Sequence, residues 1–169
     1  MILVGGRHVD EAMIAEIDVY DPMTDEWSTP ASLPLESLTS DNAAFVDPNE
    51  QIMYVVGGYV GYDYRTHSMA TQVYLNVLLG DNPSASFSRS PTQDMKVPRG
   101  DVHAVISGDG KSAYVAGGFH ADNGFCEPLD TVERFDFASQ EWKDDVGALV
   151  NGRGDKALVQ LKGRVYAVG

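Results

Sequence analysis

The chain has 169 residues, of which 43% are apolar, and carries 25 acidic against 12 basic residues, for a formal net charge of -13 at pH 7. This length and composition are typical of one domain with a real core, and the negative charge opposes nucleic-acid backbones and anionic membrane surfaces. We therefore expect neither nucleic acid nor a membrane as partner. The single cysteine, Cys126, excludes an intrachain disulfide framework and is typical of a reducing compartment, so we expect a cytoplasmic protein.

An apolar run that ends in glycine occurs four times along the chain. The runs lie at 2–6, 51–58, 113–118 and 164–169, and their first glycines, Gly5, Gly57, Gly117 and Gly169, stand at steps of 52, 60 and 52 residues. A short apolar run bounded by glycines predicts a strand buried on both faces. Paired glycines indicate that the backbone takes positive φ or passes close to another segment.

A second strand-like run follows each glycine pair, ends on an acidic residue and precedes a large aromatic residue by six positions. These runs and aromatics are 16–21 with Trp27, 76–81 with Phe87 and 131–136 with Trp142. The middle copy lacks the tyrosine and tryptophan of the first copy. We expect a strand at each run and equivalent positions for the three aromatics, with an outer strand near 85–90 in the middle copy.

Each aromatic is followed by a triplet that opens another strand. The triplets are 39–41, 99–101 and 153–155, and the strands that we expect after them are 43–46, 102–106 and 157–160. Turn residues at 47–50, 107–111 and 162–163 predict tight hairpins after these strands. Four short antiparallel strands in each repeat of about 50 residues are typical of a β-propeller blade.

These features together resemble the Kelch repeat over essentially the whole chain. They are the glycine pair after a buried strand, Tyr20-Asp21-Pro22 with Trp27, Phe135-Asp136 with Trp142, and Arg99 and Arg153 before the first strand of a blade. Thr39 stands where the family often has arginine. The resemblance implies an all-β Kelch-type β-propeller with four-stranded antiparallel blades.

The repeats divide the chain into one partial Kelch propeller over residues 1–169. We expect a partial blade at 1–30, blades at 41–91 and 101–146, and a partial blade at 155–169. A Kelch propeller closes into a ring, so this chain resembles an arc of an incomplete ring, and we expect a fragment of a longer protein. Open blade edges favour self-association.

Antiparallel order sends the longer loops, which join second to third and fourth to first strands, to one end of the blades. Loops that vary over a constant framework carry binding specificity in repeat proteins, and tyrosine and arginine are enriched in binding hot spots. We predict a partner-binding face formed by Arg7, Tyr62, Tyr64, Arg65, Arg99 and Arg153. The alternative is that the tyrosines pack on neighbouring blades and fix the loop. For Arg99 and Arg153, each in an Arg-Gly-Asp triplet, we favour a structural role over adhesion.

The resemblance also raises an enzymatic alternative. Asp63 and His67 resemble part of the iron motif of Kelch-type specifier proteins, although Tyr59 replaces its glutamate, and Cys126 with nearby tyrosines is compatible with the copper site of Kelch-type oxidases. A cation site at His120, Asp122, Asn123 and Glu127 is a further alternative. We predict no catalytic residue, metal or cofactor. The favoured function is a protein–protein interaction module with an unknown partner, and the alternative is a fragment of a Kelch-type enzyme or metal-dependent specifier.

Overall fold

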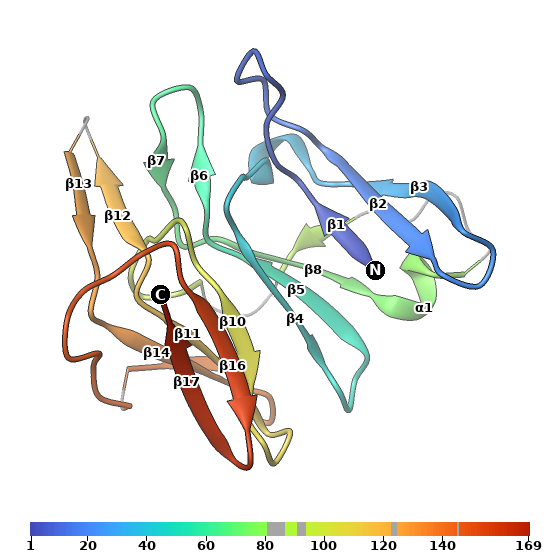
Figure 1. Cartoon of the computed structure of the whole chain (residues 1–169). Coiled ribbons are helices and arrows are strands. Elements are labelled where there is room, and N and C mark those ends of the chain that lie inside the picture. Colours follow the sequence, from blue (N-terminus) through green and yellow to red (C-terminus); the bar gives the residue numbers. More distant parts are fainter. Residues whose placement is uncertain (81–86, 91–93, 123–124, 145) are drawn as a thin grey trace.

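The computed structural model describes residues 1–80, 87–90, 94–122, 125–144 and 146–169. Within these residues the chain forms antiparallel sheets that stand side by side in an arc, and they do not close into a ring (Figure 1). The predicted all-β fold of propeller blades is confirmed. We number the four main sheets as blades in chain order.

Counted over the described residues, the blades have three, four, four and two strands. The first blade holds β1 (Ile2–Val4), β2 (Glu16–Asp21) and β3 (Glu26–Ser32). The second holds β4 (Ala43–Asp47), β5 (Ile52–Val56), β8 (Ala70–Tyr74) and β9 (Ser88–Arg89). The third holds β10 (Ala104–Ile106), β11 (Ser112–Ala116), β14 (Val132–Asp136) and β15 (Glu141–Lys143). The fourth holds β16 (Ala157–Leu161) and β17 (Arg164–Val168).

Two further hairpins and two short helices complete the described elements. The hairpins are β6 (Tyr59–Val60) with β7 (Arg65–Thr66) and β12 (Phe119–Asp122) with β13 (Phe125–Pro128). The helices are the 3-10 turn η1 (Leu35–Ser37) and α1 (Leu75–Leu78). Both hairpins extend the same end of the blades, as Figure 1 shows.

Strand β5 shows why the apolar runs carry no polar alternation. All five of its residues are buried, because neighbouring blades cover both of its faces. Met53 and Val55 pack with Ile17 and Leu33 of the first blade and its following loop. The alternate residues of β5 pack against the third blade, where the Tyr54 ring lies tilted against Phe135 with ring centroids 5.0 Å apart. In β1 and β17, by contrast, residues stay partly or fully exposed.

The large aromatics occupy equivalent positions, as predicted. Trp142 lies opposite Phe135 in the third blade, and Trp27 lies opposite Tyr20 in the first. Phe87 directly precedes β9, in line with the residue that follows Gln72 on β8. Trp142 and Phe87 are each 2% exposed because each packs toward the preceding blade. Trp27 belongs to the first blade and is 51% exposed.

The strand predicted at 76–81 is wrong. The strand that pairs with β5 is β8, and the next four residues, Leu75–Leu78, form α1. Leu78 is 1% exposed and fills the core between the first two blades. A short apolar run is compatible with either helix or strand, so periodicity could not decide between them here. Residue Asp81 and part of the predicted outer strand near 85–90 lie outside the described residues.

The glycine pairs join each blade to the next. The N–H of the second glycine donates to the carbonyl of the first residue in the next triplet: Gly6 to Thr39 (3.1 Å), Gly58 to Arg99 (2.8 Å) and Gly118 to Arg153 (2.9 Å). The first glycines have φ of 58–65°, and a Cβ on Gly117 would lie 2.5 Å from the Arg153 carbonyl oxygen. Glycine is therefore required by both the backbone conformation and the close approach.

The same triplet residue returns a side-chain hydrogen bond to its own blade. Thr39 Oγ1 donates to the Gly57 carbonyl (2.8 Å), Arg99 Nη1 to the Gly117 carbonyl (2.8 Å) and Arg153 Nη1 to the Gly169 carbonyl (2.9 Å). Threonine in the first triplet thus makes the bond that arginine makes in the others. These contacts support the structural role expected for the triplet arginines.

Candidate functional site

A pocket of about 590 Å³ lies among the loops at the end that carries the β6–β7 and β12–β13 hairpins. The loop between β1 and β2 reaches the same end (Figure 1). Side chains link these loops: the Tyr64 hydroxyl donates to Glu11, and Thr66 Oγ1 donates to the Ala121 carbonyl (3.1 Å). Loops from three successive blades therefore form one mouth. The described residues that line the pocket are Gly6, Arg7, His8, Glu11, Ser40, Asp41, Tyr59, Asp63, Tyr64, Asp101, Ala121, Phe125 and Cys126.

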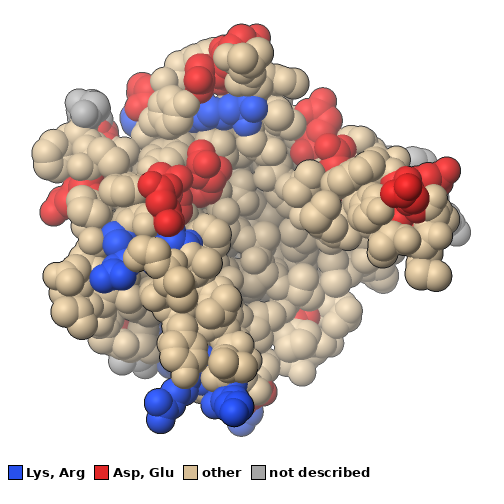
Figure 2. All heavy atoms as spheres, viewed as in Figure 1, with Lys and Arg blue, Asp and Glu red and all other residues tan. Residues whose placement is uncertain are grey.

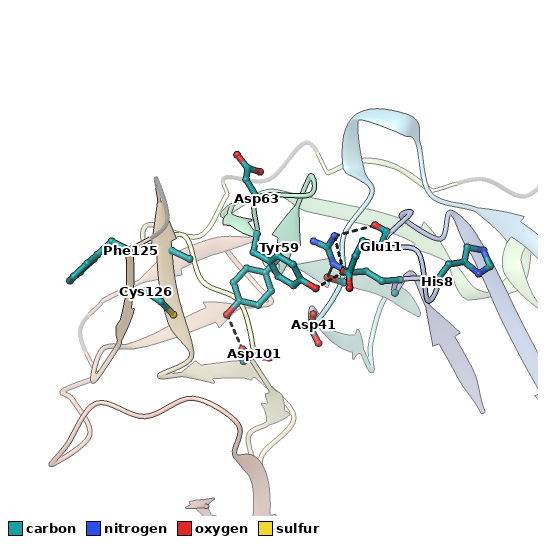
Figure 3. Close-up of a pocket in the computed structure, with 13 residues that line it drawn as sticks. His8, Glu11, Asp41, Tyr59, Asp63, Asp101, Phe125 and Cys126 are labelled. Carbon is teal, nitrogen blue, oxygen red and sulfur yellow. Dashed lines mark hydrogen bonds and ion pairs between the residues drawn. The ribbon is translucent and has the colours of Figure 1, made fainter.

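Tyr59 forms the centre of the pocket because of its place in the repeat. It directly follows a glycine pair, and its backbone pairs with Ser40 of its own blade. Its ring lies over Gly100, where an added Cβ would be 2.5 Å from the ring. The Tyr59 hydroxyl donates to Asp101 Oδ2 at 2.8 Å, which Figure 3 shows as a dashed line below the ring. The glycine of the second triplet thus makes room for an aromatic wall of the pocket.

Aspartates recur at the third position of every triplet. Asp41, Asp101 and Asp155 have φ of 53°, 47° and 45°, a left-handed conformation that aspartate adopts more readily than most residues. Together they line a smaller cavity of about 90 Å³. Burial raises the pKa of Asp101 above its usual value, the Tyr59 hydrogen bond lowers it, and the charges of Asp155 and Asp41 raise it. Asp41 and Asp155 therefore lie close enough to Asp101 to influence its ionisation.

Arg7 is held on the other side of Tyr64. Its guanidinium carbon lies 4.1 Å from the centre of the Tyr64 ring, in a cation–π contact. Its Nε donates to Ser40 Oγ at 3.0 Å, and its Nη1 lies 4.0 Å from Glu11 Oε2. The Tyr64 ring also meets Tyr59 edge to face, with centroids 5.7 Å apart. The arginine and the two tyrosines thus form one packed unit.

The structure separates the six residues predicted for the partner-binding face into three groups. Arg7 and Tyr64 line the pocket. Tyr62 and Arg65 lie on the β6–β7 hairpin, where Tyr62 is 73% exposed and Arg65 Nε pairs with Asp63 at 2.9 Å. The two interpretations of the loop tyrosines each hold for part of the set. Tyr59 and Tyr64 pack against their neighbours, whereas Tyr62 lies outside the core.

The third group is the triplet arginines. Arg99 is 0% exposed, and its guanidinium bonds to the Gly117 and Thr131 carbonyls, the Thr131 hydroxyl and Glu133 Oε1 (2.8 Å). Arg99 has no exposed area, its guanidinium is bonded within the chain and it does not line the pocket, so it is not part of the candidate site. Arg153 is half-buried, and its described side-chain bond goes to the Gly169 carbonyl.

The residues of the metal alternatives have other contacts. His67 Nε2 lies 3.0 Å from Thr39 Oγ1, and its Nδ1 accepts from the Met69 N–H (3.1 Å), whereas Asp63 pairs with Arg65. Among the described residues no group of three or more His, Cys, Asp or Glu side chains is arranged to hold a metal ion. Asn123, from the third candidate set, lies outside the described residues.

Sequence reasoning missed the carboxylates and Tyr59 as parts of the mouth. The sequence does contain a signal for this contact. The residue after each glycine pair is large, and the middle residue of the next triplet is small. The pairs are Arg7 with Ser40, Tyr59 with Gly100 and Phe119 with Gly154, and a Cβ on Gly154 would collide with the Phe119 ring. A large residue always faces a small one across the blade junction.

Comparisons with known proteins agree with this architecture. A family model described as the Kelch motif matches residues 103–144, which span β10 to β15. Kelch-like protein 36 from Bos taurus is 26% identical over 177 residues, covering 100% of this chain and 25% of that protein. Alpha-scruin from Limulus polyphemus is 36% identical over 58 residues, covering 34% of this chain and 6% of that protein.

The antiparallel sheets, joined in an arc through their glycine pairs, define the chain as a set of β-propeller blades. The Kelch motif matched in the third blade, together with the similarity to Kelch-like protein 36 and alpha-scruin, supports blades of the Kelch type. The chain spans about a quarter of the length of the first relative and less of the second. No helix in the described part of the chain has the length and apolar character needed to cross a membrane.

Proposed function

We propose that this chain is a protein–protein interaction module that binds a protein partner with the long-loop end of its Kelch blades. The observation that carries the proposal is the convergence of loops from three successive blades around a pocket of about 590 Å³. The opposite end consists of short hairpins, such as 47–51 and 107–111, that close neighbouring strands. The long-loop end therefore offers a concave surface with varied side chains.

The composition of the mouth supports protein binding. Tyr62 is 73% exposed on the β6–β7 hairpin, with Arg65 beside it and Tyr64 at the rim of the pocket, 40% exposed. Tyrosine and arginine supply large contact area and multiple hydrogen bonds, and they are enriched where alanine substitution weakens complexes most. Tyr64 is already fixed by Arg7, Glu11 and Tyr59, so little entropy is lost when a partner covers it.

Two further parts of the proposal follow from the sequence. The single cysteine among 169 residues is typical of a reducing compartment, so we propose that the partner is met in the cytoplasm. The edges of β1 and β17 carry exposed apolar residues such as Leu3 and Val168, which favours self-association of this chain in isolation.

Capture of partners from a cell extract, compared between the chain and its variants, tests the proposal. Replacing Tyr62 and Arg65 together by alanine removes exposed side chains of the mouth and should lower capture about thirtyfold, the effect of a hot spot worth about 2 kcal/mol. The matched control replaces Lys111 and Lys162 by alanine in hairpins at the opposite end. Circular dichroism checks that both variants fold. Loss of capture in the control variant and retention in the Tyr62/Arg65 variant would place binding at the wrong end and refute the proposal.

A further inference from the structure

The pocket at the mouth is lined by more negative than positive charge. Four of its lining residues are carboxylates, Glu11, Asp41, Asp63 and Asp101, whereas Arg7 is the one permanent cation among the described lining residues. Figure 3 shows Asp101 and Asp41 on the inner side of Tyr59, Glu11 on one flank and Asp63 above the ring. The mouth pocket is therefore acidic, whereas its arginines alone would predict a basic pocket.

The carboxylates nearest Tyr59 have few partners among the described residues. There, Asp101 accepts a neutral hydrogen bond from Tyr59. Asp41 is exposed, and in the described part of the chain no donor bonds to its carboxylate. Asp155 lies near both, in the adjoining cavity of about 90 Å³. Like charges in one hollow repel each other, and a cation placed among them relieves that repulsion.

The arginines near the mouth do not serve as counter-ions for Asp41 and Asp101. The Arg7 side chain is 9% exposed and stays beneath Tyr64, with Glu11 as its ion-pair partner. Arg65 is mostly exposed and pairs with Asp63 in solvent, where such pairs are weak. Neither arginine is bonded to Asp41 or Asp101 in the described structure.

Arg7 also provides a second observation that points to a ligand. Its Nη2 is buried, and among the described residues no atom accepts a hydrogen bond from it. A buried N–H without an acceptor is costly, so an acceptor supplied from the pocket that Arg7 lines would stabilise it. A peptide backbone carries a carbonyl next to every side chain. An extended segment with a cationic residue therefore satisfies the arginine donor and the carboxylates at once.

The aromatic rings of the pocket favour the same ligand. Tyr59 and Tyr64 stand edge to face, 5.7 Å between centroids, beside the carboxylates. A guanidinium or ammonium group gains a cation–π contact on such rings in addition to its ion pairs. Figure 2 shows acidic side chains, with a few basic ones between them, around the end with the β6–β7 and β12–β13 hairpins, and basic side chains at the tip of β16–β17. A cationic partner is thus attracted to the mouth end.

We propose that the mouth pocket binds the arginine or lysine side chain of an extended segment of the protein partner, with its cationic head among Asp41, Asp63 and Asp101 and a neighbouring backbone carbonyl on Arg7. This inference rests on the proposed function and specifies the chemistry of the partner.

Selection from a library of short random peptides displayed on phage, with the whole chain as bait, tests the inference. The expected result is enrichment of sequences with arginine or lysine at one fixed position. The best binder is then made with citrulline in place of that arginine, which keeps the shape and removes the charge. Affinity should fall tenfold or more, because the carboxylates lose their counter-ion.

Matched carboxylate-to-amide variants locate the binding. Asp41→Asn with Asp63→Asn should weaken the selected peptide about fivefold or more, and asparagine tolerates the positive φ of Asp41. Glu50→Gln, in a hairpin at the opposite end, is the control and should leave the affinity unchanged.

The outcomes separate the inference from the proposed function. Selected peptides that lack a cation, or that bind equally well with citrulline, overturn the inference; if their binding still needs Tyr62 and Arg65, the proposed function stands. Selected peptides that ignore every variant at the mouth overturn both. A library that yields no binder to this chain also overturns the inference.

Discussion

The junction between the second and third blades and the mouth above it each bring an arginine next to a carboxylate, with different consequences. At the junction, Arg99 is 0% exposed and Glu133 is 1% exposed. Glu133 also accepts the Lys96 N–H (2.7 Å) and the Val97 N–H (3.1 Å), so donors and acceptors on both sides are used. At the mouth, Arg7 Nη2 has no acceptor in the described part of the chain, and carboxylates outnumber the cation among the lining residues. The saturated ion pair fixes the segment that enters the third blade onto β14, whereas the unbalanced charges at the mouth retain capacity for a ligand.

The largest expected effect is at the junction. Arg99→Ala leaves Glu133 charged and buried without its ion-pair partner, which should lower the free energy of unfolding by about 4 kcal/mol. Arg7→Ala, the matched change at the mouth, should cost less, because Glu11 remains partly exposed to water. Urea unfolding followed by circular dichroism measures both. An Arg7→Ala cost equal to or above that of Arg99→Ala would contradict the distinction between the two sites.

A second test concerns the glycine that joins the third blade to the fourth. Gly117→Ala places a methyl group 2.5 Å from the Arg153 carbonyl oxygen at a φ of 58° and should cost about 3 kcal/mol. Gly163→Ala is the control, since its φ is also positive, 76°, but nothing lies within 4 Å of the added carbon. That change should cost about 1 kcal/mol. Equal losses of thermal stability would show that close approach between blades contributes nothing.

These junctions also show how far the sequence could predict the structure. The spacing of the glycine pairs and of Trp27 and Trp142 predicted the blades, because every repeat uses the same local pattern for the same contact. The failures involve non-local contacts. Leu78 was predicted to lie in a strand. It lies in a helix because it packs against the first blade, and the local sequence pattern does not contain that contact. The pairing of Arg99 with Glu133 joins residues 34 positions apart, and the local pattern around each contains no sign of it.

The candidate site was predictable in position but not in charge. Antiparallel order located the long-loop end and therefore Tyr62, Tyr64 and Arg65. Arg7 and Arg99 were both placed at the partner-binding face, Arg99 with a structural role favoured over adhesion, whereas their side chains are 9% and 0% exposed because groups on other segments cover them. The acidic lining arises because each triplet brings its aspartate to one opening, which becomes visible only when three blades are assembled.

A smaller, stabilising effect is expected from a buried lysine next to the third junction. Lys156 is 2% exposed, and among the described residues its Nζ has no hydrogen-bond partner. Burial, together with Arg99 and Arg153, lowers the pKa of Lys156 to about 8. Lys156→Met removes this buried charge and should raise the free energy of unfolding at pH 7 by about 2 kcal/mol.

The pH dependence of that gain has a definite sign. Because the folded-state pKa lies below the ordinary value of 10.5, the folded protein binds fewer protons than the unfolded chain between about pH 8 and 10.5. The stability contribution of Lys156 therefore improves as pH rises through this window, and the advantage of Lys156→Met should shrink. Unfolding of both proteins at pH 7 and at pH 10 checks this. An advantage that grows toward pH 10 would be inconsistent with a buried cation.

The smallest effect on stability is expected at the mouth itself. Tyr62 is 73% exposed and belongs to neither core cluster, so Tyr62→Ala should change the free energy of unfolding by less than about 0.5 kcal/mol. Tyr59→Phe, which removes the bond to Asp101, should cost about 1 kcal/mol and serves as the comparison. Thermal unfolding of the two variants distinguishes a residue available for binding from one that supports the pocket.

The most direct test of the central claim, that the long-loop end binds the partner, is mapping of backbone amide NMR shifts on addition of the best arginine-bearing peptide. We expect the largest shifts in residues 5–15 and 57–67 and around Asp101, with saturation as the peptide is added. Shifts concentrated in the opposite hairpins, at 47–51, 107–111 and 162–163, would contradict it.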